Sequence, residues 1–436
     1  MIPQKQLSLA DIFEDCKNIH VSDKPQFLSL LEKHIDLDEI IPTSFFNHYY
    51  AATGRNRKYP LTAMLWALII QRLFSIPTDS LLLIFLHYSR PLRDFCGFNK
   101  VPDASKITRF KQDFLPDLQS VFDNLVDITE PICQNIDSNL ASMLLFDTSG
   151  IEAYVTENNP KYANRIIKQL KAYARSNNFN SSYDPYKAAY AAMPTSASSN
   201  HEVKQQYING HFCYAYKFGI TTNGLGIVRS IDFYNKDYIA SHPDIVVEKK
   251  SKSPDEDKSL ADSKALLPTL KDFKTRHPDI NPTVFLGDAA FDTIEIYKSL
   301  FEDFNFKKAF IPLKVKLSMD NVNYTFNEDG IPCCPHDPSL PMKREGSKSN
   351  LRSKLPTMKF VCPKMKWEYT YKIRVNVEKS INHFKDSFCV ANRKTTNEKT
   401  LHADLLLSGI SQLLTVVVAD KINQRQHIRS LKSFIA

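Results

Sequence analysis

The stretch Tyr371-Lys-Ile-Arg374-Val-Asn-Val-Glu378-Lys-Ser-Ile-Asn-His-Phe-Lys385 carries more information about the fold than any other segment of the chain. If it is helical, with about 100° between successive residues, a phenol, a guanidinium, a carboxylate and an amine fall within an arc of about 60°. These are Tyr371, Arg374, Glu378 and Lys385. Four apolar residues occupy the neighbouring arc: Val377, Ile381, Phe384 and Phe388. The pattern predicts a polar stripe along the rim of a buried face, because a solvated stripe would lie opposite the apolar arc.

The composition indicates a large intracellular protein. The chain has 436 residues, 43% of them hydrophobic, which is enough for two or three domains. Its formal charge of +8 and pI of about 8.8 suit a polyanionic partner without requiring one. The first residues are mixed and polar, unlike a signal peptide, and no apolar run reaches the roughly 18 residues of a membrane span. We therefore expect no membrane partner, a cytosolic location and reduced cysteines.

The N-terminal third reads as helical. Residues 61–74, 80–88 and 104–114 show apolar side chains at helical spacing. Asp103 precedes the last of these segments and is expected to cap a basic helix containing Lys106, Arg109 and Lys111. That helix could enter a DNA groove, or it could be an ordinary surface helix.

The pattern changes to alternating strands and helices near residue 140. Residues 142–146 predict a buried strand that ends at Asp147, and residues 212–220 and 227–233 predict a hairpin that turns at Asn223-Gly224. Residues 282–286 predict another buried strand, which ends at Gly287-Asp288. Helices are expected at 260–273, 292–304 and 401–421, the last one amphipathic, and a short strand at 308–311. Residues 155–205 and 312–370 lack this pattern and are interpreted as insertions. The order predicts an α/β fold with a mixed sheet flanked by helices.

Asp147, Asp288 and Glu378 end or occupy three separate elements that can meet at one edge of such a sheet. Three carboxylates can hold two Mg²⁺ or Mn²⁺ ions for phosphodiester chemistry, with Arg374 and Lys385 holding the phosphates. Each acid also has a structural interpretation. Asp147 could cap a turn, Glu378 could form an ordinary i, i+4 pair with Arg374, and Asp288 has a rival in Asp292, which is expected to cap the next helix.

The spacing of Tyr371, Arg374, Glu378 and Lys385 resembles the Y-R-E-K signature of bacterial insertion-sequence transposases with a DDE site (the insertion sequence four/five-like superfamily). Leu145-Phe-Asp147-Thr-Ser-Gly-Ile and Phe285-Leu-Gly-Asp288-Ala-Ala-Phe-Asp resemble the blocks around the first and second acids. Three N-terminal stretches look like the helical region of the same proteins: Gly54-Arg-Asn-Arg-Lys-Tyr-Pro60, Arg93-Asp-Phe-Cys-Gly97 and Val101-Pro-Asp-Ala-Ser105. The resemblance covers most of residues 45–415.

The resemblance implies a ribonuclease-H-like catalytic core in which Asp147, Asp288 and Glu378 bind the two metal ions. It also implies cleavage at element ends and strand transfer into target DNA, with Tyr371, Arg374 and Lys385 contacting DNA near the cleaved phosphate. The expected domains are residues 1–135, all helical and binding DNA ends, 136–311 for the first part of the core, 312–370 for an irregular β-rich insertion, 371–425 for the last catalytic helices, and 426–436 for a tail. The expected partners are terminal inverted repeats, target DNA and further copies in a homodimer or larger synaptic complex. The expected location is the bacterial cytoplasm, at the nucleoid.

Three further motifs allow two interpretations each. Cys333, Cys334, His336 and Cys362 could bind Zn²⁺, although their spacing lacks two clean C-x₂-C pairs, or they could be unpaired thiols. Trp367 could stack on a base flipped out of a DNA hairpin, as an aromatic does in some relatives, or pack in a core. The lysines and arginines between residues 161 and 175 could follow phosphates or form a solvated helix face.

The sequence thus predicts a metal-dependent DNA transposase. One alternative is a ribonuclease-H-like, structure-specific nuclease that lacks strand transfer. The other is a domesticated DNA-binding protein without catalysis. Terminal inverted repeats beside the gene would favour the transposase over the nuclease, and the intact set of three acids argues against the non-catalytic protein.

Overall fold

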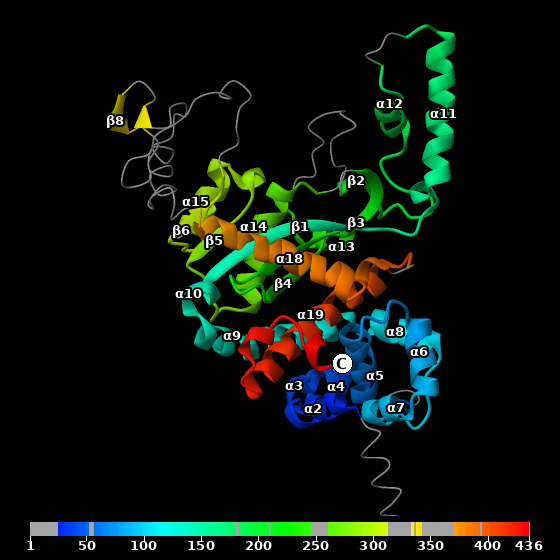
Figure 1. Ribbon diagram of the computed structural model, residues 1–436, viewed down its shortest axis with the longest axis vertical. Coiled ribbons are helices and arrows are strands. Elements are labelled where there is room, and N and C mark those ends of the chain that lie inside the picture. The colour runs from blue at the N-terminus through cyan, green and yellow to red at the C-terminus, as the bar shows by residue number, and fades with distance from the viewer. Residues whose placement is uncertain are drawn as a thin grey trace, which may run out of the picture. The chain divides into compact units, whose positions relative to one another are not determined.

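The structure is a computed structural model, and it describes residues 25–51, 56–179, 183–208, 211–245, 260–312, 333–334, 337–341, 369–392 and 395–435. The chain forms two units, and Figure 1 labels their helices and strands. Unit 1 comprises residues 1–125 and 406–436, and unit 2 comprises residues 126–405.

Unit 1 is helical in its described residues, as the sequence predicts. Its elements are α2 (Gln26–His34), α3 (Leu37–Ile40), α4 (Thr43–Tyr49), α5 (Leu61–Leu73), α6 (Asp79–Tyr88), α7 (Arg90–Cys96), α8 (Ala104–Asp113), η7 (Arg425–His427) and η8 (Lys432–Phe434). Helices α9 (Leu115–Ile136) and α19 (Glu398–Lys421) contribute residues to both units. The helices expected at 61–74, 80–88 and 104–114 are confirmed as α5, α6 and α8.

Helix α8 begins where the sequence predicts, because the Asp103 side chain accepts a hydrogen bond from the backbone N–H of Lys106 at 3.1 Å. Lys106 and Arg109 are exposed. Lys111 is fully buried, and its Nζ lies 2.8 Å from Asp79 Oδ1. Two cations of this basic helix therefore face solvent, while the third belongs to the core of unit 1.

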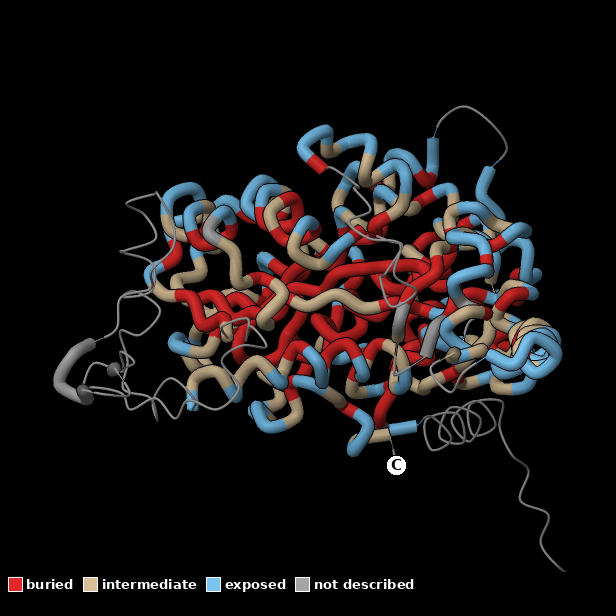
Figure 2. Tube along the Cα trace, turned by 90° about the horizontal axis from the view of Figure 1, so that it is seen from above, coloured by how far each residue is buried: buried red, intermediate tan, exposed pale blue. Residues whose placement is uncertain are grey.

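Unit 2 is built on a mixed sheet with the order β2-β3-β1-β5-β6, in which β4 also pairs with β3. The strands are β1 (Met143–Glu152), β2 (Lys204–Ile208), β3 (His211–Thr222), β4 (Val228–Phe233), β5 (Val284–Leu286) and β6 (Lys308–Phe310). Strand β3 runs antiparallel to β1, β2 and β4, whereas β1, β5 and β6 are parallel. Every residue from Cys213 to Tyr234 is buried, so the central strands are red in Figure 2.

The other described elements of unit 2 are mostly helical. They are α10 (Ser138–Ala141), η1 (Thr156–Asn158), α11 (Pro160–Ser176), α12 (Pro185–Ala192), α13 (Lys236–Ser241), α14 (Asp262–Arg276), η2 (Ala289–Phe291), α15 (Ile294–Glu302), η4 (Lys372–Arg374), α18 (Val375–Asn382), η5 (His383–Ser387) and η6 (Val390–Asn392). A separate two-stranded sheet joins β7 (Cys333–Cys334) and β8 (Asp337–Pro341) within the predicted insertion.

The expectation of a hairpin across 212–233 is confirmed, with a longer turn than an Asn-Gly pair makes. Strand β3 ends at Thr222 and β4 begins at Val228. The Asn223 side chain accepts hydrogen bonds from the backbone N–H groups of Leu225 and Ile227, each at 3.1 Å. Gly226, with φ of 77°, supplies the left-handed residue that the turn needs.

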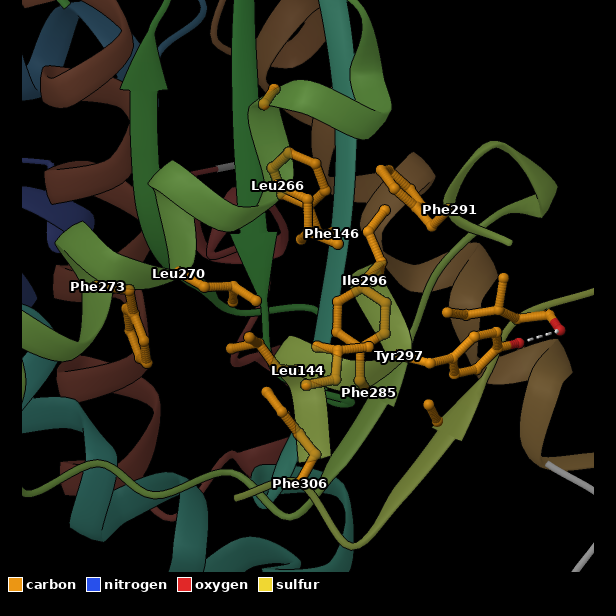
Figure 3. Packing of buried hydrophobic residues seen from close by; sticks show 14 of the residues in the cluster. Leu144, Phe146, Leu266, Leu270, Phe273, Phe285, Phe291, Ile296, Tyr297 and Phe306 are labelled. Atoms are coloured by element: carbon orange, nitrogen blue, oxygen red, sulfur yellow. Dashed lines mark hydrogen bonds between the residues drawn. The ribbon is translucent and has the colours of Figure 1, made fainter. Parts of the chain in front are cut away.

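One face of the sheet packs against α14 and α15. Figure 3 shows Leu144 and Phe146 of β1 and Phe285 of β5 among side chains from both helices, including Leu266 and Ile296. Because side chains alternate along a strand, Leu144 and Phe146 on this face place Asp147 on the opposite face.

Helix α19 corrects two expectations: that residues 401–421 form an amphipathic helix, and that no apolar segment is long enough to cross a membrane. The segment was expected to be amphipathic, but nearly all of its residues are buried. Among the described residues, α19 alone is long and apolar enough to cross a membrane by length and composition, and 94% of its apolar window is buried in the protein. This is the burial expected of a core helix.

Candidate active site

Asp147 lies within β1, two residues beyond the last pairing of this strand with β5. It pairs in register with Ile220 of β3, and its Oδ1 accepts a hydrogen bond from the backbone N–H of Thr148 at 2.9 Å. The Asp147 side chain is 19% exposed. The strand was expected to end at Asp147, but it continues to Glu152. The residues before and after Asp147 are therefore both part of the strand.

The segment that carries the polar stripe is helical, as predicted, although it is not a uniform α-helix. Residues 372–374 form a 3-10 turn, α18 follows, and residues 383–387 form a π-helical turn. Val377, Ile381, Phe384 and Phe388 are all buried, which confirms the apolar arc. A π-turn is frequently found at a functional site, and this one contains Lys385.

Two hydrogen bonds fix α18 to the β3–β4 turn. Asn376 Nδ2 donates to the carbonyl of Gly224, and Ser380 Oγ donates to the carbonyl of Gly226, both at 2.7 Å. Helix α18 also packs against β1 and β3. These contacts set the axial position of the helix and so place its polar stripe beside Asp147.

Arg374 joins the first and third predicted acids. Its Nη2 donates to Asp147 Oδ2 at 2.9 Å, and its Nη1 donates to Glu378 Oε1 at 2.5 Å. The guanidinium is 13% exposed, whereas the Glu378 side chain is 46% exposed. The i, i+4 pair considered for Arg374 and Glu378 is therefore present, but it is half of a bridge that also reaches β1.

Asp288 is placed beside Asp147 by strand register. Strands β1 and β5 are parallel and pair Leu145 with Leu286, so Asp147 and Asp288 each lie two residues beyond the same paired position. Neighbouring strands are about 4.8 Å apart. Asp288 also caps the short helix η2, because its Oδ1 accepts a hydrogen bond from the backbone N–H of Ala290 at 2.8 Å.

The expected capping role of Asp292 is wrong. Helix α15 begins at Ile294, and its N-cap is Thr293, whose hydroxyl accepts a hydrogen bond from the backbone N–H of Ile296 at 3.3 Å. A threonine placed one residue nearer the helix supplies the cap. Asp292 instead ends η2.

Electrostatics tie these groups together. Burial raises the pKa of Asp147 to about 7, Arg374 opposes this shift, and the negative charge of Asp288 reinforces it. For Arg374, burial disfavours the charged form, yet the neighbouring acids, chiefly Asp147, raise its pKa. Burial also raises the pKa of Tyr371, and Arg374 opposes that shift. The structure thus brings Tyr371, Arg374, Asp147, Asp288 and Glu378 within electrostatic range of one another.

Lys385 completes the stripe from the π-turn. Burial lowers the pKa of its amine, against the influence of Cys213, Asp386 and Asp147. Asp147 is thus one of the charges that act on this amine. Among the described residues, no carboxylate forms an ion pair with Lys385. A partly buried cation of this kind is suited to an anionic ligand.

Sequence reasoning missed a second group of charges, on the opposite face of β1. Thr148 Oγ1 donates to Asp262 Oδ1 at 2.5 Å, and Lys217 Nζ lies 2.8 Å from the same oxygen. Lys217 opposes the effect of burial on Asp262, and the pKa of Asp262 is lowered. The sequence does contain a signal for this group. Lys217 lies in the middle of an apolar strand, and a lysine in that position requires a partner for its charge.

The donor set of the three predicted acids is chemically suited to a divalent cation, because carboxylate oxygens are hard ligands. The like charges that raise the pKa of Asp147 are those that a cation would neutralise. Two of the acids hold Arg374, and within the described ranges no three His, Cys, Asp or Glu side chains are grouped to bind an ion. A cation that binds Asp147 and Glu378 would therefore displace the guanidinium of Arg374 or share the two carboxylates with it.

The remaining motif predictions fall largely outside the described ranges. His336, Cys362 and Trp367 are not among the described residues, so the structure places neither the predicted zinc set nor the tryptophan. Four other cysteines, Cys96, Cys133, Cys213 and Cys389, are free and buried, in agreement with the expected reduced state.

Comparison with protein families adds one finding. Residues 17–113 match the family described as Transposase domain (DUF772). This match supports a transposase. It covers the N-terminal stretches that resemble the helical region of insertion-sequence transposases, and it supports an enzyme that acts on DNA. No curated protein and no solved structure is significantly similar to the chain.

Proposed function

We propose that the protein is a DDE transposase of the Y-R-E-K type that cleaves DNA at insertion-sequence ends and transfers the strands into target DNA. The single observation that carries this proposal is the Arg374 bridge. It joins Asp147 and Glu378 beside Asp288, in a chain whose residues 17–113 match a transposase domain. An ordinary surface ion pair would not connect a strand and a helix at the position that the signature assigns to the catalytic acids.

The sheet supports a ribonuclease-H-like core. Its antiparallel part, β1, β3 and β4, and its parallel part, β1, β5 and β6, share the strand that carries Asp147. Asp147 lies on the strand common to both parts and Asp288 follows the neighbouring parallel strand, at the carboxyl ends where α/β sheets place their sites.

In this proposal Asp147, Asp288 and Glu378 bind two Mg²⁺ or Mn²⁺ ions. The ions would supply activation of water or of a DNA 3′-hydroxyl and stabilisation of the leaving oxygen. Arg374 is held by acids on two sides and can pass from them to a DNA phosphate, which it can bind bidentately. Lys385 holds the phosphate as a point charge, and Tyr371 contacts DNA at the edge of the site.

The wider organisation is part of the same proposal. Residues 1–135 would bind the terminal inverted repeats, residues 136–311 and 371–425 would form the catalytic core, and 312–370 would be an insertion within it. The protein would act on double-stranded DNA as a homodimer or larger synaptic complex, in the bacterial cytoplasm. The exposed Lys106 and Arg109 of α8 are candidates for contact with DNA.

The decisive experiment is excision and joining from a donor plasmid that carries the native flanking DNA, comparing the wild-type protein with Glu378→Gln. We expect Mg²⁺-dependent excision and joining by the wild type and neither by the variant, while binding to the element ends is retained. An equally active variant would disprove the assigned site. Cleavage without joining would favour the nuclease, and binding without nicking of a supercoiled plasmid in Mg²⁺ would favour the non-catalytic DNA-binding protein.

A further inference from the structure

Two helices inserted after β1 form a projection from unit 2. Helices α11 (Pro160–Ser176) and α12 (Pro185–Ala192) pack against each other, and in Figure 1 they stand clear of the strands. The sequence predicts an insertion over residues 155–205 and allows a helix only at its basic residues, 161–175, so the pairing of α11 with α12 is a finding of the structure. We call these two helices, with residues 160–179 and 183–192, the basic arm.

The charge of the basic arm has one sign over most of its length. Residues 158–183 contain five cations and no acidic residue: Lys161, Arg165, Lys168, Lys171 and Arg175. At about 100° per residue, the five lie within an arc of about 120° along the whole of α11. All except Lys171 are exposed. The opposite face is apolar and includes the buried Ile167.

The arm is well supported at its far end. Phe179 contacts Tyr173 and Tyr183, with ring centroids 5.7 and 4.9 Å apart. Lys171 Nζ donates to the Tyr186 hydroxyl at 3.0 Å and lies over the same ring. These contacts join α11 to α12, so Lys171 has a role within the arm that the other four cations do not have.

The base of the arm is tied to the catalytic sheet. Asn158 Oδ1 accepts a hydrogen bond from the backbone N–H of Tyr214, and Asn158 Nδ2 donates to the carbonyls of Ala153 and Tyr214, all at 2.7 Å. Strand β1, which carries Asp147, leads directly into this base. From Asp147 to Glu152 the strand covers about 17 Å, at about 3.3 Å per residue. The arm is therefore in reach of a duplex bound at the candidate site.

A solvated helix face is the competing interpretation, and three lysines on other helices of unit 2 argue against it. On α14 and α15, Lys264, Lys271 and Lys298 each pair with a carboxylate, from Glu295, Asp244 and Glu302. None of the five arm cations pairs with a carboxylate of a described residue. Neighbouring like charges at i, i+3 and i, i+4 destabilise the helix, and a bound polyanion would relieve this repulsion.

We propose that the basic arm binds the phosphate backbone of double-stranded DNA without reading its sequence, as a second DNA contact in addition to the N-terminal unit. The inference rests on the proposed function, since that supplies DNA as the substrate. The stripe from Lys161 to Arg175 is about 21 Å long, at 1.5 Å per residue. A duplex presents about one phosphate charge per 1.7 Å of its axis, so several phosphates face such a stripe.

The test is the salt dependence of DNA binding by the full-length protein, measured by fluorescence anisotropy with a duplex of unrelated sequence. The arm variant carries Lys161→Gln, Arg165→Gln, Lys168→Gln and Arg175→Gln, which keep helix-forming residues and spare Lys171. Each lost phosphate contact lowers the slope of log K against log salt by about 0.9, so we expect the loss of four contacts to lower the slope by about 3.6. Thermal unfolding of the variant should match the wild type.

The matched control carries Lys264→Gln, Lys271→Gln, Lys274→Gln and Lys298→Gln, an equal loss of charge from α14 and α15. We expect its slope to change by less than about 1. A second variant, which exchanges Lys and Arg at the four arm positions, should keep the wild-type slope because the charges remain. An arm variant with the wild-type slope, or a control that loses as much as the arm variant, would overturn the proposal.

The donor-plasmid assay separates this inference from the proposed function. If the wild-type protein excises and joins DNA but the arm variant keeps the wild-type slope, the transposase function is supported and DNA binding by the arm is disproved. If the wild-type protein does not cleave DNA but the slope depends on the arm, DNA binding by the arm is supported and the transposase function is disproved.

Discussion

Arg374 Nη2 donates a hydrogen bond of 2.9 Å to Asp147 Oδ2, across 227 residues of chain. The same guanidinium holds Glu378, so one cation compensates two acids from separate elements. The guanidinium between them explains how two acids that repel one another can remain close. This arrangement also makes Arg374 the competitor of any cation that binds there.

Replacing Arg374 with Gln should therefore affect stability and ion binding in opposite directions. Without divalent ions, loss of the largely buried pair should lower the free energy of unfolding by about 2 kcal/mol. The rise in Tm caused by Mn²⁺ should be larger than in the wild type, because the guanidinium no longer competes. Thermal unfolding in EDTA and in MnCl₂ measures both effects. Arg276→Gln, which breaks a 3.0 Å pair with Asp232, is the control and should lower Tm without changing the Mn²⁺ effect. Equal Mn²⁺ effects in all three proteins would contradict the prediction.

Asp147→Asn should stabilise the ion-free protein at alkaline pH. The folded-state pKa of about 7 is above the ordinary value of 3.8, so the folded protein binds the proton more tightly. The associated stability is present below pH 4 and is lost as pH rises through 7. At about 1.4 kcal/mol per pKa unit, the wild type should lose on the order of 2–4 kcal/mol relative to the Asp147→Asn variant between these limits. Urea unfolding in EDTA at pH 4 and pH 8.5 measures this difference, and a constant gap between the two proteins would refute it.

The second acid can be tested against its neighbour. Asp288→Asn should reduce Mg²⁺-dependent plasmid nicking at least about 100-fold, a loss that even the outer partners of a metal can cause. Asp292→Asn should leave the nicking rate within about threefold, because Asp292 lies beyond the strand register that places Asp288 beside Asp147. Equal losses in the two variants would mean that residues 288–292 act through the local fold and not through one carboxylate.

Much of this site could be predicted because its determinants are periodic. The helical stripe with Arg374 and Glu378 follows from spacing alone, and the buried arc beside it is confirmed. Asp147 and Asp288 follow apolar runs that form neighbouring strands, so their element order already indicated one edge of a sheet. The register that pairs Leu145 with Leu286 could not be predicted, because pairing depends on packing between distant segments.

The missed features depend on contacts that have no sequence period. Helices α11 and α12 lie in a stretch rich in Asn and Ser, where polar composition hides a helix that buries little except Ile167. The π-turn at Lys385 and the five-residue turn after Thr222 are local adjustments to packing. Asp262 contacts the central strands through Lys217 and Thr148, which are remote from it in sequence.

Ser380→Ala should act on positioning more than on binding. The hydroxyl donates to the Gly226 carbonyl in a buried contact that fixes α18 on the β3–β4 turn. Its loss should lower the free energy of unfolding by about 1 kcal/mol and reduce kcat for nicking, while the Kd for DNA stays unchanged. Lys379→Ala, at the exposed neighbouring position, is the control and should change neither. A variant with unaltered kcat would show that this hydrogen bond does not set the position of Glu378.

Asp262 should show a pH dependence opposite to that of Asp147, although both influence the same strand. Its pKa is lowered, so its contribution to stability is present above pH 4 and is lost as pH falls through the folded-state pKa. Asp262→Asn removes the charge paired with Lys217, whose side chain is only 5% exposed, and should lower the free energy of unfolding at pH 7 by about 2 kcal/mol.

The double variant Lys217→Met with Asp262→Asn decides whether that loss comes from an uncompensated lysine. Met fills the space of the lysine stem without its charge, so the double variant should recover most of the stability that the single variant loses. Urea unfolding at pH 7 measures all three proteins, and the single variant should lose its disadvantage as pH falls below 4. If the double variant is no more stable than Asp262→Asn, the contact of Asp262 with Thr148 carries the stabilisation, and the pair has no separate role in supporting β1 behind Asp147.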